Sequence, residues 1–222
     1  MTQRDNQLHL LRQEVINMST LVRIQIEKGK EMLVLRNKNS ATEIVCTKKE
    51  IDAYECRVDA RCGKLFAVHN PLMHDMSFLL LSMKITNNLE NIANIAYVLS
   101  QYILENKKTN TDLLRTSALL SQLDVSNDIL WDIQLAFENE SPKLADKIMQ
   151  RAVILKMISD KSIQNLEKII TNDPENTASL NFFISIIHKL QRATDQIKSI
   201  AKDLLEFEGS ELVTQLINYQ AN

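Results

Sequence analysis

Apolar residues recur along this chain with the spacing of α-helices, and short polar or proline-containing stretches divide them into six segments. In the first segment, about residues 5–36, the apolar positions follow a period of roughly 3.6 residues. These positions are Leu8, Leu11, Val15, Met18, Leu21, Val22 and Ile26. The pattern predicts a long amphipathic helix, a break at the polar stretch 37–40, and a second helix over 41–67.

Prolines mark the starts of later helices. The residue before a proline disfavours the α region, so we expect the second helix to end before Pro71 and a third to begin there. Pro142 and Pro174 open the fifth and sixth helices in the same way, and a fourth helix fills 110–139. We expect Gly209 to end the sixth helix, because glycine is favoured just beyond a helix C-terminus.

Two of the proline-started helices carry the same polar pair. The third helix has Glu90 and Asn94, and the sixth has Gln191 and Asp195, each 101 residues after its counterpart. Residues four apart share one helix face, so each pair can reach a single object, such as a metal ion or another helix. The matching layout indicates an internal duplication.

Composition supports this organisation. Three glycines and three prolines in 222 residues, with 5% aromatic residues, favour long helices over a sandwich or barrel. Short connections favour antiparallel neighbours. We predict an all-α protein of two tandem, pseudo-symmetric, spectrin-like three-helix bundles, with residues 1–106 as the first repeat and 107–222 as the second repeat plus a short tail.

Charge and hydropathy narrow the range of functions. A net charge of −2 offers no basic footprint for nucleic acid. The longest apolar run, 95–99, is far too short to insert into a membrane, and no apolar stretch follows the first methionine. An odd number of cysteines fits a reducing compartment. We therefore expect a cytoplasmic protein.

The two motif regions resemble the PhoU family of bacterial phosphate-uptake regulators. In that family the third helix of each three-helix bundle begins near a proline and carries an E(D)xxxD motif, within a run similar to LERIGDxAxNIA. Here the first copy reads LENIANIA over 89–96, and the second reads LQRATDQIKSIA over 190–201. The PxxxDL opening of the family survives as Pro71 and Asp75, with methionine in place of its leucine.

The resemblance implies multinuclear metal binding by repeated carboxylates, and this chain departs from that pattern. Asn94 and Gln191 each replace one carboxylate of the motif. Counting back across the turn places Asp52 near the level of Glu90, so the remaining candidate metal ligands are Glu90, Asn94, Asp52 and Asp195. Because hard cations need several oxygen ligands, we expect no tightly bound cofactor and at most weak binding of a divalent ion or iron.

In the second half, a lysine offers positive charge in place of a metal. Lys156 lies close to the expected level of Asp195, and we predict a structural salt bridge between them. The alternative is that both side chains point to solvent. No histidine has the spacing of a di-iron bundle and no catalytic signature is recognisable, so we do not expect an enzyme.

Three functions remain open. The resemblance implies a regulator that binds the ATPase of a phosphate transporter and a phosphate-sensing histidine kinase; a homodimer is also open. The second is a metal-free PhoU-like module of another transporter, such as a sodium–phosphate cotransporter. The third is a metal-binding protein built on a helical bundle.

Overall fold

A computed structural model describes residues 3–68, 73–105, 110–139, 142–169 and 174–220. These ranges form α-helices and contain no strand, which confirms the predicted all-α class. The helices are α1 (Gln3–Leu35), α2 (Lys38–Val68), α3 (Met73–Leu104), α4 (Thr111–Thr116), α5 (Leu119–Asn139), α6 (Pro142–Glu167) and α7 (Pro174–Gln220). None of the described helices is both long and apolar enough to cross a membrane.

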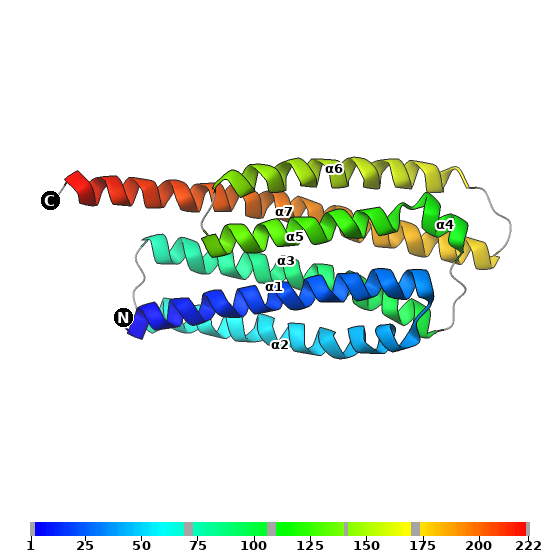
Figure 1. Ribbon diagram of the computed structural model, residues 1–222, viewed down its shortest axis with the longest axis horizontal. Coiled ribbons are helices and arrows are strands. Elements are labelled where there is room, and N and C mark those ends of the chain that lie inside the picture. Colours follow the sequence, from blue (N-terminus) through cyan, green and yellow to red (C-terminus); the bar gives the residue numbers. More distant parts are fainter. Residues whose placement is uncertain (1–2, 69–72, 106–109, 140–141, 170–173, 221–222) are drawn as a thin grey trace.

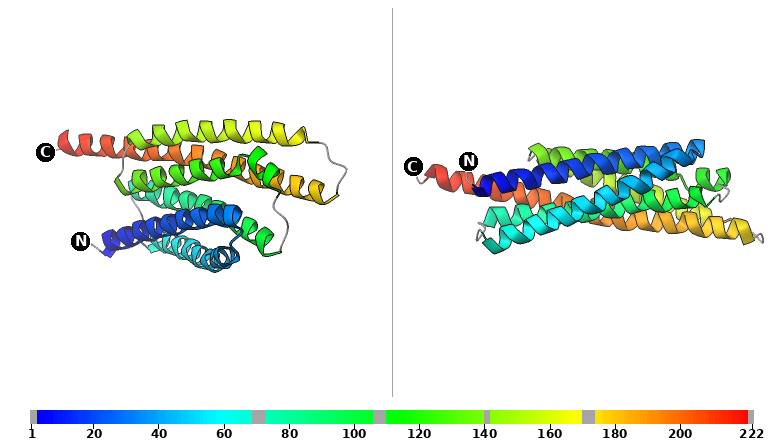
Figure 2. Two further views of the ribbon diagram at one scale, coloured as in Figure 1. Left: turned by 45° about the vertical axis from the view of Figure 1, so that its right-hand side comes forward. Right: turned by 90° about the horizontal axis from the view of Figure 1, so that it is seen from below.

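The long helices lie roughly along one axis in two groups of three (Figures 1 and 2). Helices α1, α2 and α3 pack on one another, as do α5, α6 and α7, and the short α4 contacts the second group. The predicted stripe of α1 faces inward: Leu11, Met18 and Val22 are fully buried. The arrangement is the predicted pair of three-helix bundles.

The two bundles join where α3 contacts α7 and α1 contacts α5. At one point the rings of Phe78 and Phe137 stack with centroids 5.3 Å apart. The Arg12 guanidinium lies over both rings, and its Nη1 donates a hydrogen bond to the Phe137 carbonyl at 2.8 Å. Further along, Asn88 Nδ2 donates to the Ala193 carbonyl at 3.2 Å.

The break between α1 and α2 is shorter than the predicted 37–40. Arg36 adopts a left-handed φ of 54°, and α2 already begins at Lys38. The side chain of Asn37 accepts a hydrogen bond from the backbone N–H of Asn39 at 3.0 Å. The polar stretch is therefore mostly the capped first turn of α2, because an asparagine there satisfies N–H groups that the helix itself leaves free.

The predicted fourth helix, 110–139, is two helices. Ala118 has a φ of 47° and separates α4 from α5. Buried Gln122 stabilises the break: its Nε2 donates to the Ser117 carbonyl at 2.7 Å, and its Oε1 accepts from Ser159 Oγ of α6 at 2.7 Å. The prediction was wrong because this break depends on a contact with another helix and not on a local helix breaker.

The sixth predicted helix does not end at Gly209. Helix α7 continues to Gln220, and no described glycine has the positive φ of a helix-ending residue. A glycine inside a helix costs about 1 kcal/mol relative to alanine, which weakens the helix without ending it. The predicted starts at Pro142 and Pro174 agree with the structure, whereas Pro71 and the boundary after residue 106 lie outside the described residues.

Candidate functional site

The charged cluster beside the first motif is centred on a lysine. Lys48 of α2 is buried, and its ammonium group donates hydrogen bonds to Asp52, one turn along the same helix, and to Glu90 Oε1 of α3 at 2.7 Å. Asp52 and Glu90 thus lie together with a cation between them. We did not predict Lys48, although its i,i+4 spacing from Asp52 was an available signal.

The environment keeps Lys48 charged. Burial alone lowers the pKa of Lys48, but its hydrogen bonds to Asp52 and Glu90, together with their negative charges, outweigh burial and raise the pKa above its ordinary value. The neighbouring Glu55 is held toward its neutral form instead: burial raises its pKa, and the charges of Glu90 and Asp59 raise it further. Negative charge therefore still exceeds positive charge around Glu55.

These residues do not fit the multinuclear metal site that the family resemblance implies. Both carboxylates that approach each other, Asp52 and Glu90, already share the Lys48 ammonium group. Across the described part of the chain, no group of three or more His, Cys, Asp or Glu side chains is placed to hold a metal ion. Asn94 makes no hydrogen bond to this cluster within the described ranges, and it lines a cleft between α3 and α7.

The second motif has no buried charge. Gln191 Nε2 donates to Asp160 Oδ1 of α6 at 2.7 Å, and Gln191 Oε1 lies 2.9 Å from the His188 ring nitrogen Nδ1. Both ends of the amide are therefore engaged. Asp160 and His188 are exposed, so this short chain of polar groups lies at the surface.

The predicted Lys156–Asp195 salt bridge is not among the ion pairs of the described residues. Asp195 is 67% exposed and pairs with Lys198 of its own helix at 3.8 Å. Lys156 lies four residues before Asp160 and Asp195 four residues after Gln191, so the two do share a level across the hairpin. Both side chains nevertheless lie at the surface, where water screens their attraction and leaves little reason for them to pair.

The second half places its buried charge elsewhere. The carboxylate of Asp132 on α5 is 1% exposed; its Oδ1 accepts from Lys147 Nζ at 2.9 Å and its Oδ2 from Arg151 Nη1 at 2.6 Å, both from α6. We did not predict this site. Asp132 shares its side of α5 with the buried Ile129 and Ala136, three residues before it and four after, and a carboxylate beside such apolar positions is the signal that points to a buried ion pair.

Asp75, the surviving acidic residue of the PxxxDL opening, forms an ion pair between two helices. It is buried near the start of α3 and pairs with Arg4 of α1. No cation stands within the four residues after Asp75 in the sequence. The cation that faces Asp75 therefore comes from another helix, and the pair links α3 to the N-terminal turn of α1.

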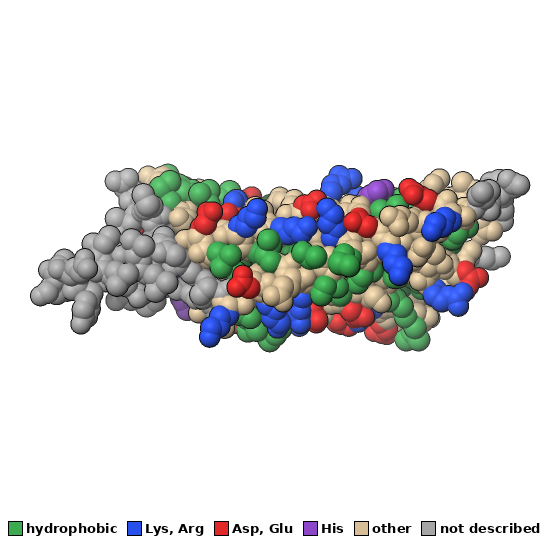
Figure 3. All heavy atoms as spheres, turned by 90° about the horizontal axis from the view of Figure 1, so that it is seen from above, with side chains coloured by type: hydrophobic (Ala, Val, Ile, Leu, Met, Phe, Trp, Pro, Cys, Tyr) green, Lys and Arg blue, Asp and Glu red, His purple; other side chains and the backbone are tan. Residues whose placement is uncertain are grey.

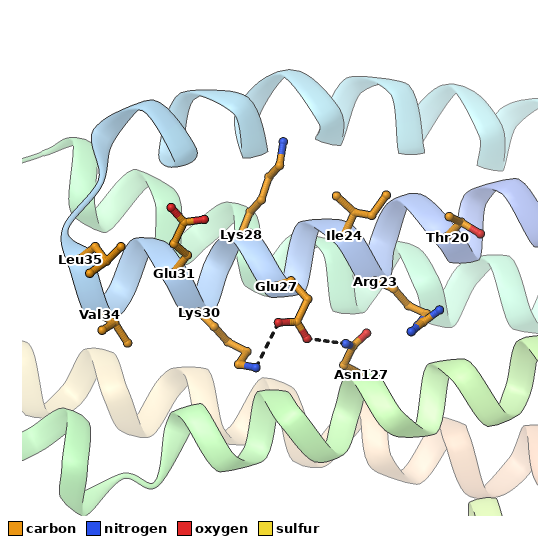
Figure 4. Close-up of a pocket in the computed structure, with 10 residues that line it drawn as sticks. All are labelled: Thr20, Arg23, Ile24, Glu27, Lys28, Lys30, Glu31, Val34, Leu35 and Asn127. Carbon is orange, nitrogen blue, oxygen red and sulfur yellow. Dashed lines mark hydrogen bonds and ion pairs between the residues drawn. The ribbon is translucent and has the colours of Figure 1, made fainter.

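A cleft of about 640 Å³ lies along α1 beside α5. Figure 4 shows Glu27 between Lys30 and Asn127, which bond its two carboxylate oxygens. Lys30 also pairs with Asp124 of α5, and Arg23 lies over the Trp131 ring. Lys30 is thus already paired with carboxylates and Arg23 is stacked on a ring, and these contacts link α1 of the first half to α5 of the second.

Comparison with solved structures defines the class of this fold. The chain superposes on the crystal structure of PhoU from Pseudomonas aeruginosa with a TM-score of 0.80 and 18% sequence identity, covering 92% of this chain and 98% of that chain. The molecule therefore has the all-helical PhoU fold.

Sequence comparisons agree with the fold. Residues 15–103 match the PhoU domain. The phosphate-specific transport system accessory protein PhoU homolog of Streptococcus pneumoniae serotype 4 is 24% identical over 216 residues, which is 95% of this chain and 97% of that protein. A protein of the same name from Deinococcus radiodurans is 21% identical over 194 residues, 84% of this chain and 87% of that protein. The chain thus matches the PhoU domain over its first half and is similar to proteins named PhoU homologs over most of its length.

Proposed function

We propose that this protein is an accessory regulator of phosphate uptake and phosphate signalling that acts by binding other proteins. Its partners in this proposal are the ATPase of a phosphate transporter and a phosphate-sensing histidine kinase. The observation that carries the proposal is the likeness to the Streptococcus pneumoniae accessory protein over 95% of this chain and 97% of that protein. The charged groups of Glu90 and Asp132 are held in internal ion pairs, which suits a binding protein better than an enzyme.

An exposed apolar stripe on α6 supports a role in protein binding. Val153, Ile154 and Met157 share one face of this helix and are about half exposed or more. Figure 3 shows hydrophobic side chains along the middle of this face of the molecule, between groups of either charge. Contiguous exposed apolar side chains with a charged rim are typical of protein–protein contacts.

Capture from cells tests the proposal. The tagged chain is expected to retain a transporter ATPase and a sensor kinase from lysate of phosphate-fed cells. Ile154→Asp combined with Met157→Asp should reduce capture, whereas Gln150→Asp combined with Gln164→Asp adds the same charge at exposed polar positions of α6 and should not. Capture of neither protein by the unmodified chain would reject the proposal.

A metal-free module of another transporter is the second candidate function. It is favoured by Lys48, whose ammonium group already supplies a cation to Asp52 and Glu90. In the same capture experiment, a sodium–phosphate cotransporter would then replace the ATPase and the kinase.

We further propose that neither function needs a resident metal. Elemental analysis of protein purified without chelator is expected to show fewer metal ions than protein chains. Several tightly held iron or zinc ions per chain would instead favour the third candidate, a metal-binding bundle.

A further inference from the structure

A small cleft lies between α3 and α7, where the two halves meet. Its volume is about 200 Å³. It is lined by Asn91, Asn94, Lys189, Arg192, Ala193 and Gln196. The lining contains two cations and three amide side chains and no carboxylate. This charge composition distinguishes it from the larger cleft beside α5, which is lined by carboxylates as well as cations.

The two cations of this cleft have no partner among the described residues. Lys189 is half-buried and Arg192 is exposed, and neither takes part in a hydrogen bond or ion pair there. The nearest carboxylates along the sequence are engaged elsewhere, because Glu90 bonds Lys48 and Asp195 pairs with Lys198. Positive charge is therefore left unneutralised at the cleft, and a half-buried ammonium group gains most from an added anion.

The amide groups add hydrogen-bond donors to the same cleft. Gln196 Oε1 accepts from Asn88 Nδ2 at 3.2 Å and from Asn91 Nδ2 at 3.4 Å. Its oxygen is thus occupied, and its NH₂ group has no acceptor among the described residues. The same is true of the amide of Asn94. Ammonium, guanidinium and NH₂ groups together present N–H donors on two sides of the cleft.

We propose that this cleft binds a small tetrahedral oxyanion of the phosphate class. Arg192 suits it because a guanidinium group can donate two parallel hydrogen bonds to such an anion, and Lys189 adds a mobile point charge. The cleft is smaller than the roughly 300–1,000 Å³ of typical pockets for larger ligands, and it has no aromatic lining on which a base could stack.

Because of the position of the cleft, a bound anion would contact both halves of the molecule. Asn91 and Asn94 belong to α3 of the first half, and Lys189, Arg192 and Gln196 belong to α7 of the second. A bound oxyanion bonds both halves and holds them in one relative arrangement. If the protein regulates phosphate uptake as proposed, this arrangement would report the phosphate supply, and that step rests on the proposed function. The binding site itself is inferred from the cleft alone.

The chemistry has two sources, free phosphate and a phosphoryl group on a partner's side chain. Isothermal titration calorimetry of the purified full chain separates them, with inorganic phosphate in one arm and a short phosphoserine peptide in the other, each at low and moderate salt. Saturable binding in the phosphate arm identifies free phosphate as the ligand. Saturable binding in the peptide arm alone identifies a phosphorylated partner.

Two variants test whether binding occurs at this cleft. Lys189→Gln combined with Arg192→Gln is expected to weaken binding by at least about tenfold, since each charge-assisted hydrogen bond contributes about a factor of ten. Asn94→Asp changes little in shape but places a negative charge in the cleft, and it should weaken binding comparably. Thermal unfolding followed by circular dichroism verifies that each variant is folded.

The matched control removes the same charge elsewhere. Lys64→Gln combined with Lys202→Gln changes two exposed lysines, one on α2 and one ten residues beyond Arg192, about 15 Å along α7. This variant should bind as the unmodified chain does. Equal binding by the control and by the Lys189 and Arg192 variant, or no saturable binding in either arm, overturns the proposal. Neither result depends on whether the protein regulates a transporter.

Discussion

Besides Asp75, which has the single partner Arg4 among the described residues, each half buries one charged group between two opposite charges, but the two groups differ in sign and in place. In the first half the buried group is a cation, Lys48, held by Asp52 and Glu90 across α2 and α3. In the second it is an anion, Asp132, held by Lys147 and Arg151 across α5 and α6. A charge inside a bundle is tolerated when opposite charges from a neighbouring helix surround it. The comparison shows that the two repeats met this condition separately, and that only the first did so at its motif helix.

The largest effect should come from the buried anion. Asp132→Asn removes the charge shared by Lys147 and Arg151, and we expect a loss of about 2–4 kcal/mol in the free energy of unfolding. Asp128→Asn is the matched control, because Asp128 lies one turn away and is 63% exposed; its effect should stay below about 1 kcal/mol. Urea denaturation measures both. Equal losses would show that the buried ion pairs of Asp132 contribute no more to stability than the exposed pair of Asp128.

The buried cation should have the next largest effect. Lys48→Met leaves Asp52 and Glu90 close together without their cation, and we expect a loss of about 1–3 kcal/mol. Much of this loss should be recovered when Glu90→Gln is added, since a double-mutant cycle isolates the pair. Lys49→Met at the exposed neighbouring position should change stability by less than about 0.5 kcal/mol. Strictly additive single and double variants would mean that Lys48 and Glu90 are not coupled.

Glu55 tests whether excess negative charge remains in the first half. Its pKa is raised in the fold, chiefly by burial, so its contribution to stability is complete below the pKa of the unfolded chain and is lost as the pH rises through the raised value. Glu55→Gln should therefore stabilise the protein at pH 7, by less than about 1 kcal/mol because the site is partly hydrated, and should have no effect in acid. Glu50→Gln, at an exposed position of α2, controls for the substitution. A gain that persists at low pH would assign the effect to something other than the charge.

The smallest effects are expected at the exposed motif pair of the second half. Lys156→Ala and Asp195→Asn should each change the free energy of unfolding by less than about 0.5 kcal/mol, and the double variant should equal the sum of the two. A coupling free energy above about 1 kcal/mol between the two substitutions would instead indicate a salt bridge between Lys156 and Asp195.

Much of the architecture could be predicted from the sequence. The period of apolar residues fixed the long helices, and Pro142 and Pro174 marked two helix starts correctly, because both signals act locally. The break at Ala118 could not be predicted in this way, since Gln122 stabilises it through a serine of another helix. Gly209 misled because glycine permits a helix end without requiring one.

The candidate sites could be predicted only in part. The level of Asp52 beside Glu90 follows from counting across an antiparallel turn, but that counting gives no sign of which side chains are buried. Lys48 and Asp132 therefore escaped notice, although each is the centre of its cluster. The same counting puts Lys156 and Asp195 at one level, but it gives no sign that both side chains are exposed.

The links between the halves have a consequence for how the chain is made. Arg12 bonds the carbonyl of Phe137, 125 residues later, and Asn88 bonds that of Ala193, 105 residues later. During synthesis from the N-terminus at about 5–20 residues per second, α1–α3 are complete for several seconds before their partner helices exist. During that interval the face of α3 that packs on α7 is exposed to solvent. The rate of synthesis therefore sets how long the first three helices wait for the residues that they contact in the second half.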